Sequence, residues 1–185
     1  MGTGSGNNSY DRRLHFDVGF NYQRTFGDHS IYSQLKWDYE NHDPNGINNT
    51  VNRQNFTWWS HYGYKNRYFV DLALVESASN RLAPGTKWNF SPTLSAAWVL
   101  SKENFMEDAT WIDFLKLRAS AGIINVDNLP GDEVWAYYAQ QYATSGGGYA
   151  FDSGWNSEFG RTYLGMMATA NPTNEKAYKY NVGVD

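Results

Sequence analysis

The chain has 185 residues, which is enough for one domain with a sizeable core. Its formal charge of −4 is small and mixed in sign, so a nucleic-acid partner is not expected, and the absence of cysteine excludes disulfides and thiolate metal sites. Residues 1–11 are rich in Gly, Asn and Ser and are expected to be a linker or a loop remnant rather than a signal peptide.

Alternation of apolar and polar residues dominates the chain from residue 12 onward. Over 14–23 every second residue is Leu, Phe, Val or Tyr, which predicts a β-strand with one apolar face. A turn at 27–29 and a second alternating run over 31–39 predict a hairpin. Further runs of the same kind cover 56–64, 68–74 and 88–100, the last with a local fault at Pro92.

Residues 101–112 break the alternation and are expected to form a short connection in which Ser101 caps a helical turn. The stretch DFLKLRASAGI, 113–123, then resumes it, and a final run covers 178–184. One face of that stretch would carry Leu115, Leu117, Ala119, Ala121 and Ile123, and the other Lys116, Arg118 and Ser120.

The lengths of the connections alternate along the chain. If consecutive strands are antiparallel neighbours, all short connections fall at one end of the sheet and all long ones at the other. Outer-membrane barrels have this asymmetry, with short periplasmic turns and long extracellular loops. The predicted short connections are 27–29, 65–67 and 101–112, and the predicted long loops are 43–51, 77–87 and 126–175.

Aromatic residues, 8 Trp, 14 Tyr and 10 Phe, gather near the ends of the predicted strands. Such rings favour boundaries that are apolar on one side and wet on the other, as in the girdles of membrane barrels. Lys116 or Arg118 placed at mid-bilayer facing lipid would each cost roughly 2–4 kcal/mol. We therefore expect these two side chains to face a watery lumen and the opposite face of 115–123 to contact lipid.

Three stretches in tandem carry a resemblance to a known family: WNFSPTLSAAWVLSKENFM (88–106), WIDFLKLRASAGI (111–123) and NPTNEKAYKYNVGVD (171–185). Together they resemble the barrel of SusC/RagA-type TonB-dependent outer-membrane transporters, and the match runs over roughly 12–185. Two features depart from the family pattern. Thr-Asn-Glu-Lys at 173–176 lacks the usual Leu-x-Trp before the Glu, and Ala121 stands where an aromatic residue is common.

The resemblance implies an all-β fold, an antiparallel up-and-down meander of long strands that is a segment of a transmembrane β-barrel in the bacterial outer membrane. It implies import of glycans or peptides, with outer-membrane lipid, a SusD-like lipoprotein, the TonB complex and the glycan or peptide ligand as partners. A complete transporter of this kind has a plug and about 22 strands. Seven strand candidates without a plug are expected to be a barrel portion that does not transport alone.

No residue is nominated as catalytic, as cofactor-binding or as a metal ligand. The four histidines lack ligand spacing, and the G-x-S-x-G nucleophile motif is absent. The long loop 126–175 is the best candidate for contact with a ligand or partner, although a loop this long must bury some side chains to stay ordered, so its aromatic residues are expected first to pack against their neighbours. The contact candidates are Trp135, Tyr137, Tyr138, Tyr142, Tyr149, Trp155 and Phe159.

Two alternatives stay open at this point. A soluble all-β carbohydrate-binding module would use the aromatic loop as its platform, and its apolar strand faces would meet across a sandwich core. A glycan-active enzyme would need two carboxylates about 5–10 Å apart in a cleft, and the sequence nominates none. The barrel reading predicts instead an outward apolar band flanked by aromatic rings, and insolubility without detergent.

Overall fold

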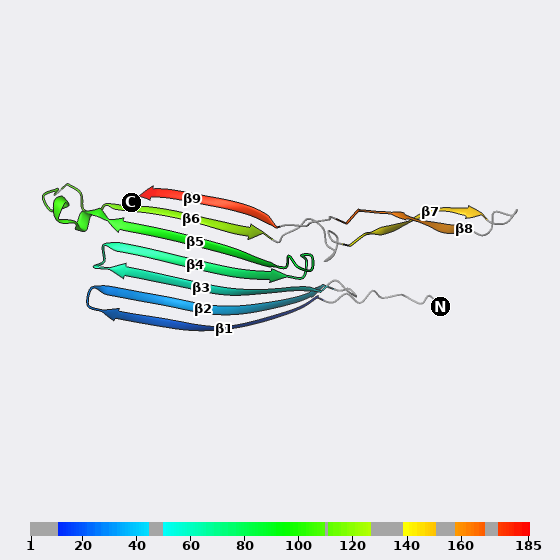
Figure 1. The fold of residues 1–185 in the computed structure, drawn as a ribbon, viewed down its shortest axis with the longest axis horizontal. Helices are drawn as coiled ribbons and strands as arrows, with labels where there is room; N and C mark the ends of the chain where they lie inside the picture. The colour runs from blue at the N-terminus through cyan, green and yellow to red at the C-terminus, as the bar shows by residue number, and fades with distance from the viewer. Residues whose placement is uncertain (1–10, 45–49, 110, 127–138, 151–157, 169–173) are drawn as a thin grey trace, which may run out of the picture.

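The computed structural model describes residues 11–44, 50–109, 111–126, 139–150, 158–168 and 174–185. Across these ranges no helix is long and apolar enough to cross a membrane. Nine strands and two short 3-10 helices make up the described part of the chain (Figure 1): β1 (Asp11–Phe26), β2 (His29–Pro44), β3 (Val51–Tyr64), β4 (Tyr68–Ser79), β5 (Trp88–Val99), η1 (Leu100–Lys102), η2 (Asn104–Met106), β6 (Lys116–Val126), β7 (Tyr142–Ala150), β8 (Glu158–Leu164) and β9 (Glu175–Val184).

Seven strands form one sheet in the order β1-β2-β3-β4-β5-β6-β9, with every neighbouring pair antiparallel. The predicted all-β antiparallel meander is therefore confirmed. Figure 1 shows the β1–β2, β3–β4 and β5–β6 connections together at one end of the sheet. Pro92 does not interrupt β5, since it pairs with Leu74 in unbroken register.

The long loop predicted over 126–175 contains a β-hairpin. β7 and β8 lie within it and form a separate two-stranded antiparallel sheet, with a register shift between Ser145 and Tyr149. The sequence of β7, YATSGGGYA, has three consecutive glycines and no apolar alternation. Glycine is depleted in strands and offers no side chain to pack, so this hairpin leaves almost no pattern in the sequence.

The short connections are shaped by a few backbone positions. Gly27, with φ of 55°, turns the chain between β1 and β2. Lys65 and Asn66, with φ of 53° and 52°, turn it between β3 and β4.

Ser101 is not the helix cap that the sequence suggested. It lies inside η1, which has Val99 at its N-cap position, and its backbone N–H donates to Leu115 O (3.2 Å), which ties the turn to the start of β6.

The register assigns every side chain of the seven-stranded sheet to one of two faces, because directly opposed residues point the same way. One face is apolar, with Phe20 opposite Leu35, Leu35 opposite Trp58 and Trp58 opposite Leu74. The other is polar, with Asp17 opposite Asp38 and Asp38 opposite Asn55. The alternation read from the sequence thus continues in phase from strand to strand.

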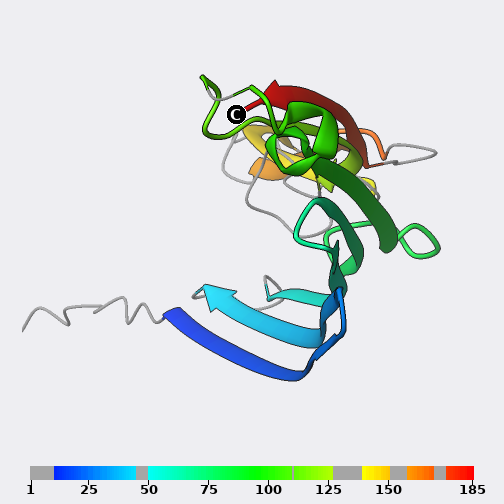
Figure 2. The same ribbon diagram turned by 90° about the vertical axis from the view of Figure 1, so that its left-hand side faces the viewer.

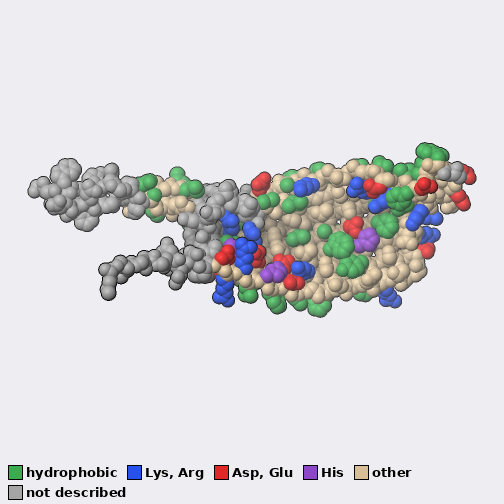
Figure 3. Space-filling view, turned by 180° about the vertical axis from the view of Figure 1, so that it is seen from behind, with side chains coloured by type: hydrophobic (Ala, Val, Ile, Leu, Met, Phe, Trp, Pro, Cys, Tyr) green, Lys and Arg blue, Asp and Glu red, His purple; other side chains and the backbone are tan. Residues whose placement is uncertain are grey.

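The sheet is curved, and its concave side is the polar one. Figure 2, a view along the strands from the short-connection end, shows the curve, and Figure 3 shows the molecule from the concave side, where charged and histidine side chains gather. Lys116 lies opposite Val99 and Arg118 opposite Ala97, in the polar phase. Both basic residues therefore face the concave side, as predicted.

Within the described residues the buried apolar core is very small and consists of Leu82, Ala83 and Val99. By contrast, large apolar side chains of the convex face are exposed, and the side chain of Phe20 is 72% exposed. No second layer covers that face among the described strands, because the only other sheet is the β7–β8 hairpin. The sandwich core expected of a soluble module is absent from the described part of the chain.

Candidate functional site: a polar concave face and two aromatic belts

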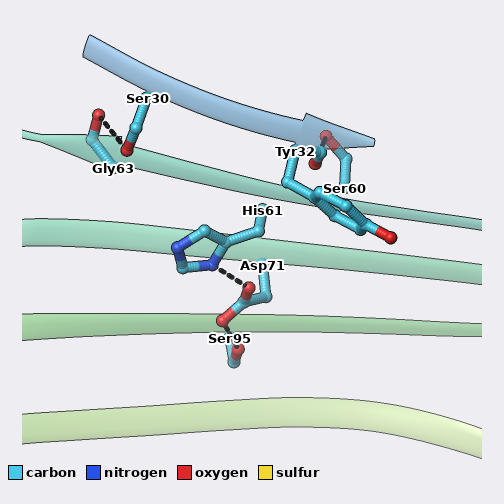
Figure 4. A network of polar contacts seen from close by, with 7 residues as sticks. All are labelled: Ser30, Tyr32, Ser60, His61, Gly63, Asp71 and Ser95. Atoms are coloured by element: carbon cyan, nitrogen blue, oxygen red, sulfur yellow. Dashed lines mark hydrogen bonds and ion pairs between the residues drawn. The ribbon is translucent and has the colours of Figure 1, made fainter. Parts of the chain in front are cut away.

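A hydrogen-bonded cluster on the concave face joins three neighbouring strands (Figure 4). His61 Nδ1 of β3 lies 2.5 Å from Asp71 Oδ1 of β4, and Ser95 Oγ of β5 donates to Asp71 Oδ2 at 3.2 Å. The His61 ring stacks on Phe69, with ring centroids 5.7 Å apart. Asp71 therefore binds one neighbour through each of its carboxylate oxygens.

This cluster differs from a hydrolytic triad. In a triad, histidine bonds to the serine nucleophile and removes its proton. Here Asp71 lies between His61 and Ser95, and among the described hydrogen bonds none joins the imidazole to the hydroxyl. The arrangement crosslinks β3, β4 and β5 and presents a polar surface to the concave side.

Two of the hollows on the concave face contain both carboxylate and cationic groups. The first, about 480 Å³, includes Glu40, Arg53, Asn55 and Thr93 in its lining. The second, about 450 Å³, includes Asp71, Lys116, Arg118 and Asn181 in its lining. Both mix carboxylate, cationic, amide and hydroxyl groups, so the concave face can hold water and polar solutes along its length.

Several cationic groups of this face are paired with carboxylates. Lys36 Nζ lies 3.8 Å from Asp17 Oδ2, and Arg118 Nε lies 3.3 Å from Asp185 Oδ1. These pairs are partly exposed, so each is worth at most about 1 kcal/mol in water. Their significance is positional, because they keep the charged groups on one side of the sheet.

A continuous aromatic belt, which we call the turn-side belt, crosses the convex face at the short-connection end. Successive rings lie 4.9–6.4 Å apart between centroids and run from β1 across to the connection after β5. The turn-side belt consists of Phe26, His29, Tyr64, Tyr68, Trp98 and Phe105.

A second belt, the loop-side belt, crosses the same face toward the opposite ends of the strands. It joins Phe16 to Trp37 (5.6 Å), Trp37 to Phe56 (6.3 Å) and Phe56 to Trp88 (6.1 Å). Because all four residues face the same side as the turn-side belt, the convex face carries two parallel rows of rings.

The spacing of the belts matches a membrane. Belt residues on one strand are eight to ten positions apart, as with Phe56 and Tyr64 on β3 or Trp88 and Trp98 on β5. At a rise of roughly 3.3 Å per residue this is about 26–33 Å along the strand. With the usual barrel tilt of about 35–45°, the height becomes roughly 18–27 Å, a range that includes the apolar band of about 25 Å of outer-membrane barrels.

Two polar side chains between the belts have their hydrogen-bond partners within the sheet. Trp58 Nε1 donates to Ser33 Oγ at 2.9 Å, and Ser60 Oγ donates to Tyr32 O at 3.5 Å. In lipid no water can replace a missing partner, so internal satisfaction is what a membrane-facing band requires. On β2 to β5 the charged side chain nearest this band on the convex face is Glu76, which lies opposite Phe56 at the level of the loop-side belt.

The polar tips of two residues of the turn-side belt, Tyr68 and Trp98, point away from the band. Tyr68 Oη and Trp98 Nε1 both donate to Glu103 Oε1, at 2.6 and 3.0 Å, and Arg67 Nη1 donates to Glu103 Oε2 at 3.4 Å. Glu103 lies beyond the strand ends, between η1 and η2. The rings are thus oriented as at a boundary, with the apolar body toward the band and the polar atom toward water.

The structure describes three of the seven contact candidates in 126–175. Tyr142 begins β7 and is 67% exposed, and Tyr149 and Phe159 are register partners across the β7–β8 hairpin. Trp135, Tyr137, Tyr138 and Trp155 lie outside the described residues. A role for these seven in ligand or partner contact remains a prediction.

The residues of the concave cluster are not among the site candidates that the sequence indicates. His61, Asp71 and Ser95 fall in the phase opposite to the apolar runs, and this is the only sequence signal that marks them. Their proximity depends on the register between strands, which the sequence does not state. In the described ranges, no group of three or more His, Cys, Asp or Glu residues could hold a metal ion.

Comparisons with known proteins agree with this architecture. The chain is 29% identical over 149 residues to a TonB-dependent receptor of Formosa agariphila, in a match covering 64% of the chain and 14% of that receptor. It is 31% identical over 71 residues to the TonB-dependent receptor SusC of Bacteroides thetaiotaomicron, covering 38% of the chain and 7% of SusC. The chain thus spans about a seventh or less of these relatives. No family model matches it.

The fold is found in the RagAB peptide transporter. The superposition has a TM-score of 0.74 at 12% identity and covers 94% of this chain and 21% of the matched chain. The protein is therefore built as an open segment of a large antiparallel β-barrel. The resemblance to SusC/RagA-type TonB-dependent transporters is confirmed for this barrel segment.

Proposed function

We propose that this chain forms part of the wall of a TonB-dependent importer in the bacterial outer membrane. The observation that carries the proposal is the pair of aromatic belts on the convex face, separated by roughly the height of an apolar bilayer band. The convex face contacts outer-membrane lipid, and the concave face with its His61–Asp71–Ser95 cluster lines the passage.

The imported solute in this proposal is a glycan or a peptide. SusC and the RagAB peptide transporter support an importer of nutrients with a SusD-like lipoprotein and the TonB complex as partners. The polar concave hollows suit solutes that carry many hydrogen-bonding groups. As a wall segment, the chain contributes a lined passage and no bond chemistry.

The test is a nitroxide scan along β6 in the complete protein that contains this chain, reconstituted into phosphatidylcholine vesicles. Because the chain has no cysteine, single cysteines at 116 to 121 give labels without background from this segment. We expect dissolved oxygen, which concentrates in lipid, to relax labels at Leu117, Ala119 and Ala121. A water-soluble nickel complex should act more strongly at Lys116, Arg118 and Ser120.

The reverse pattern, or equal access to nickel on both faces, would refute the proposal. A soluble binding module would give the second of these results, because both faces would then meet water. The import function is tested separately, by growth on limiting oligosaccharide or oligopeptide of cells that lack the gene. Normal growth on all such sources would exclude the nutrient role and leave the wall geometry intact.

A further inference from the structure

An apolar groove of about 690 Å³ crosses the convex face over β4, β5, β6 and β9. Its floor holds two exposed alanines, Ala96 and Ala119, which are directly opposed in the β5–β6 register. The methyl groups leave a depression because the surrounding side chains are much larger. Those walls are Tyr68, Val70, Trp98, Leu117 and Val182.

The groove suits an unbranched apolar occupant. The tips of Tyr68 and Trp98 are already engaged with Glu103. A sugar or peptide bound there would leave its own polar groups without partners, which is costly in an apolar site. A hydrocarbon chain has no such groups, and filling the groove restores the dispersion contacts that the alanine floor lacks.

The end of the groove at the turn-side belt is suited to a phosphate. Arg67 and Glu103 form an ion pair at 3.4 Å and together carry no net charge. Lys102 Nζ is exposed and donates only to a backbone carbonyl, Asn66 O, at 3.1 Å. Among the described ion pairs the Lys102 ammonium pairs with no carboxylate, and it lies in η1, in the connection that follows Trp98.

We propose that this groove is a binding site for a glycerophospholipid, with one acyl chain over Ala96 and Ala119 and the phosphate beside Lys102. The inference rests on the proposed function, since it requires the convex face to lie in a bilayer. The proposal adds a site for one bound lipid molecule to the general contact between the barrel wall and the bilayer.

The test uses phosphatidylglycerol brominated on its acyl chains, titrated into the complete protein in detergent micelles. Bromine quenches indole fluorescence on contact, and Trp98 is in the groove wall. The fluorescence of Trp98 is obtained by subtracting the emission of the Trp98→Phe variant from that of the unmodified protein. We expect quenching of Trp98 to saturate at a low molar ratio of lipid to protein.

Matched variants separate a site from general lipid contact. Ala119→Phe fills the floor and should abolish the saturable quenching, and Ala96→Leu provides a second, smaller filling from the opposite strand. Ala121→Phe is the control, because Ala121 is on the same strand and face but is not part of the groove lining, and the saturable phase should survive. Lys102→Gln should shift the midpoint to higher lipid concentration.

Linear quenching of Trp98, or a saturable phase unchanged by both floor variants, would overturn the lipid site. If the nitroxide scan of β6 still shows alternation, the wall in the membrane stands and only the site is lost. If the scan also fails, the proposed function itself is wrong. A saturable phase lost equally in Ala121→Phe would indicate general disruption of the face and would also refute a site at the alanine floor.

Discussion

At the scale of single residues, Glu103 fastens the short-connection end of the sheet. It accepts from side chains on β4 and β5 and from Arg67 in the β3–β4 turn. The hydrogen bond from Tyr68, then that from Trp98, and the charge of Arg67 hold the pKa of Glu103 below its usual range, against a smaller opposing effect of desolvation. The carboxylate form is thus the one that the fold prefers.

This preference predicts how stability depends on pH. A carboxyl whose pKa is lower when folded contributes fully above its unfolded value, about 4.3 for Glu, and that contribution is lost as the pH falls through the folded value. The urea midpoint of the complete protein in detergent should therefore fall on acidification through this window. The Glu103→Gln variant should show a smaller fall, and identical slopes for both proteins would contradict the role of Glu103.

Gly63 illustrates a close approach between strands on the concave face. An added Cβ would lie 2.5 Å from Ser30 Oγ and 3.2 Å from two carbons of the Phe69 ring. Gly63→Ala should therefore destabilise the fold by about 1–3 kcal/mol, the usual cost of overpacking. The double change Gly63→Ala with Ser30→Gly should recover part of this loss in urea titrations, because it removes the nearest clash. No recovery would place the strain at Phe69.

At the scale of one element, β6 separates two environments within a single strand. Ala121 faces the convex side between the belts, and Ser120 faces the concave side opposite Ser95 and Asn181. In the proposed barrel wall, adjacent residues of β6 would therefore meet lipid and water in turn. This alternation makes β6 a sensitive strand in which to place a charge.

A pair of arginine substitutions measures that difference. Ala121→Arg should destabilise the complete protein in vesicles by about 2–4 kcal/mol, the cost of Arg on a lipid-facing surface near mid-bilayer. Ser120→Arg should cost much less, because its guanidinium reaches the watery concave side. Unfolding by guanidinium chloride in phosphatidylcholine vesicles gives both values, and equal costs would argue that β6 does not lie in a bilayer.

At the scale of the whole molecule, the described sheet leaves two edges and one apolar face uncovered. β1 and β9 each pair on one side only, and the convex face exposes Phe16, Phe20, Leu94 and Tyr180 by 50% or more. Unpaired strand edges beside apolar surface promote association. Such a sheet is expected to need an apolar environment on one face and pairing partners at its edges.

The 185-residue chain produced by itself is therefore expected to aggregate in detergent-free buffer. Size-exclusion chromatography with light scattering checks this directly. A detergent such as dodecyl maltoside should restore smaller particles by covering the convex face, although the free edges would still favour oligomers. A folded monomer without detergent would contradict the barrel-wall geometry.

The sequence by itself determined the strands that carry a strong period-two pattern and the face on which each side chain lies. Alternation around Leu117 and Arg118 sufficed, because successive side chains of a strand point to opposite faces. Alternation did not reveal β7, because its three glycines carry no apolar pattern. The sequence also misplaced Ser101, because its backbone N–H bonds to Leu115 O immediately before the next strand, a contact that no local capping signal indicates.

Only the tertiary structure decided which face is concave and which residues meet across strands. The His61–Asp71–Ser95 cluster, the two aromatic belts and the alanine-floored groove all depend on register, and register is a relation between segments distant in sequence. Curvature likewise arises from the summed twist of neighbouring strands. The sequence determined what each face is made of, and the assembled sheet decided what those faces enclose.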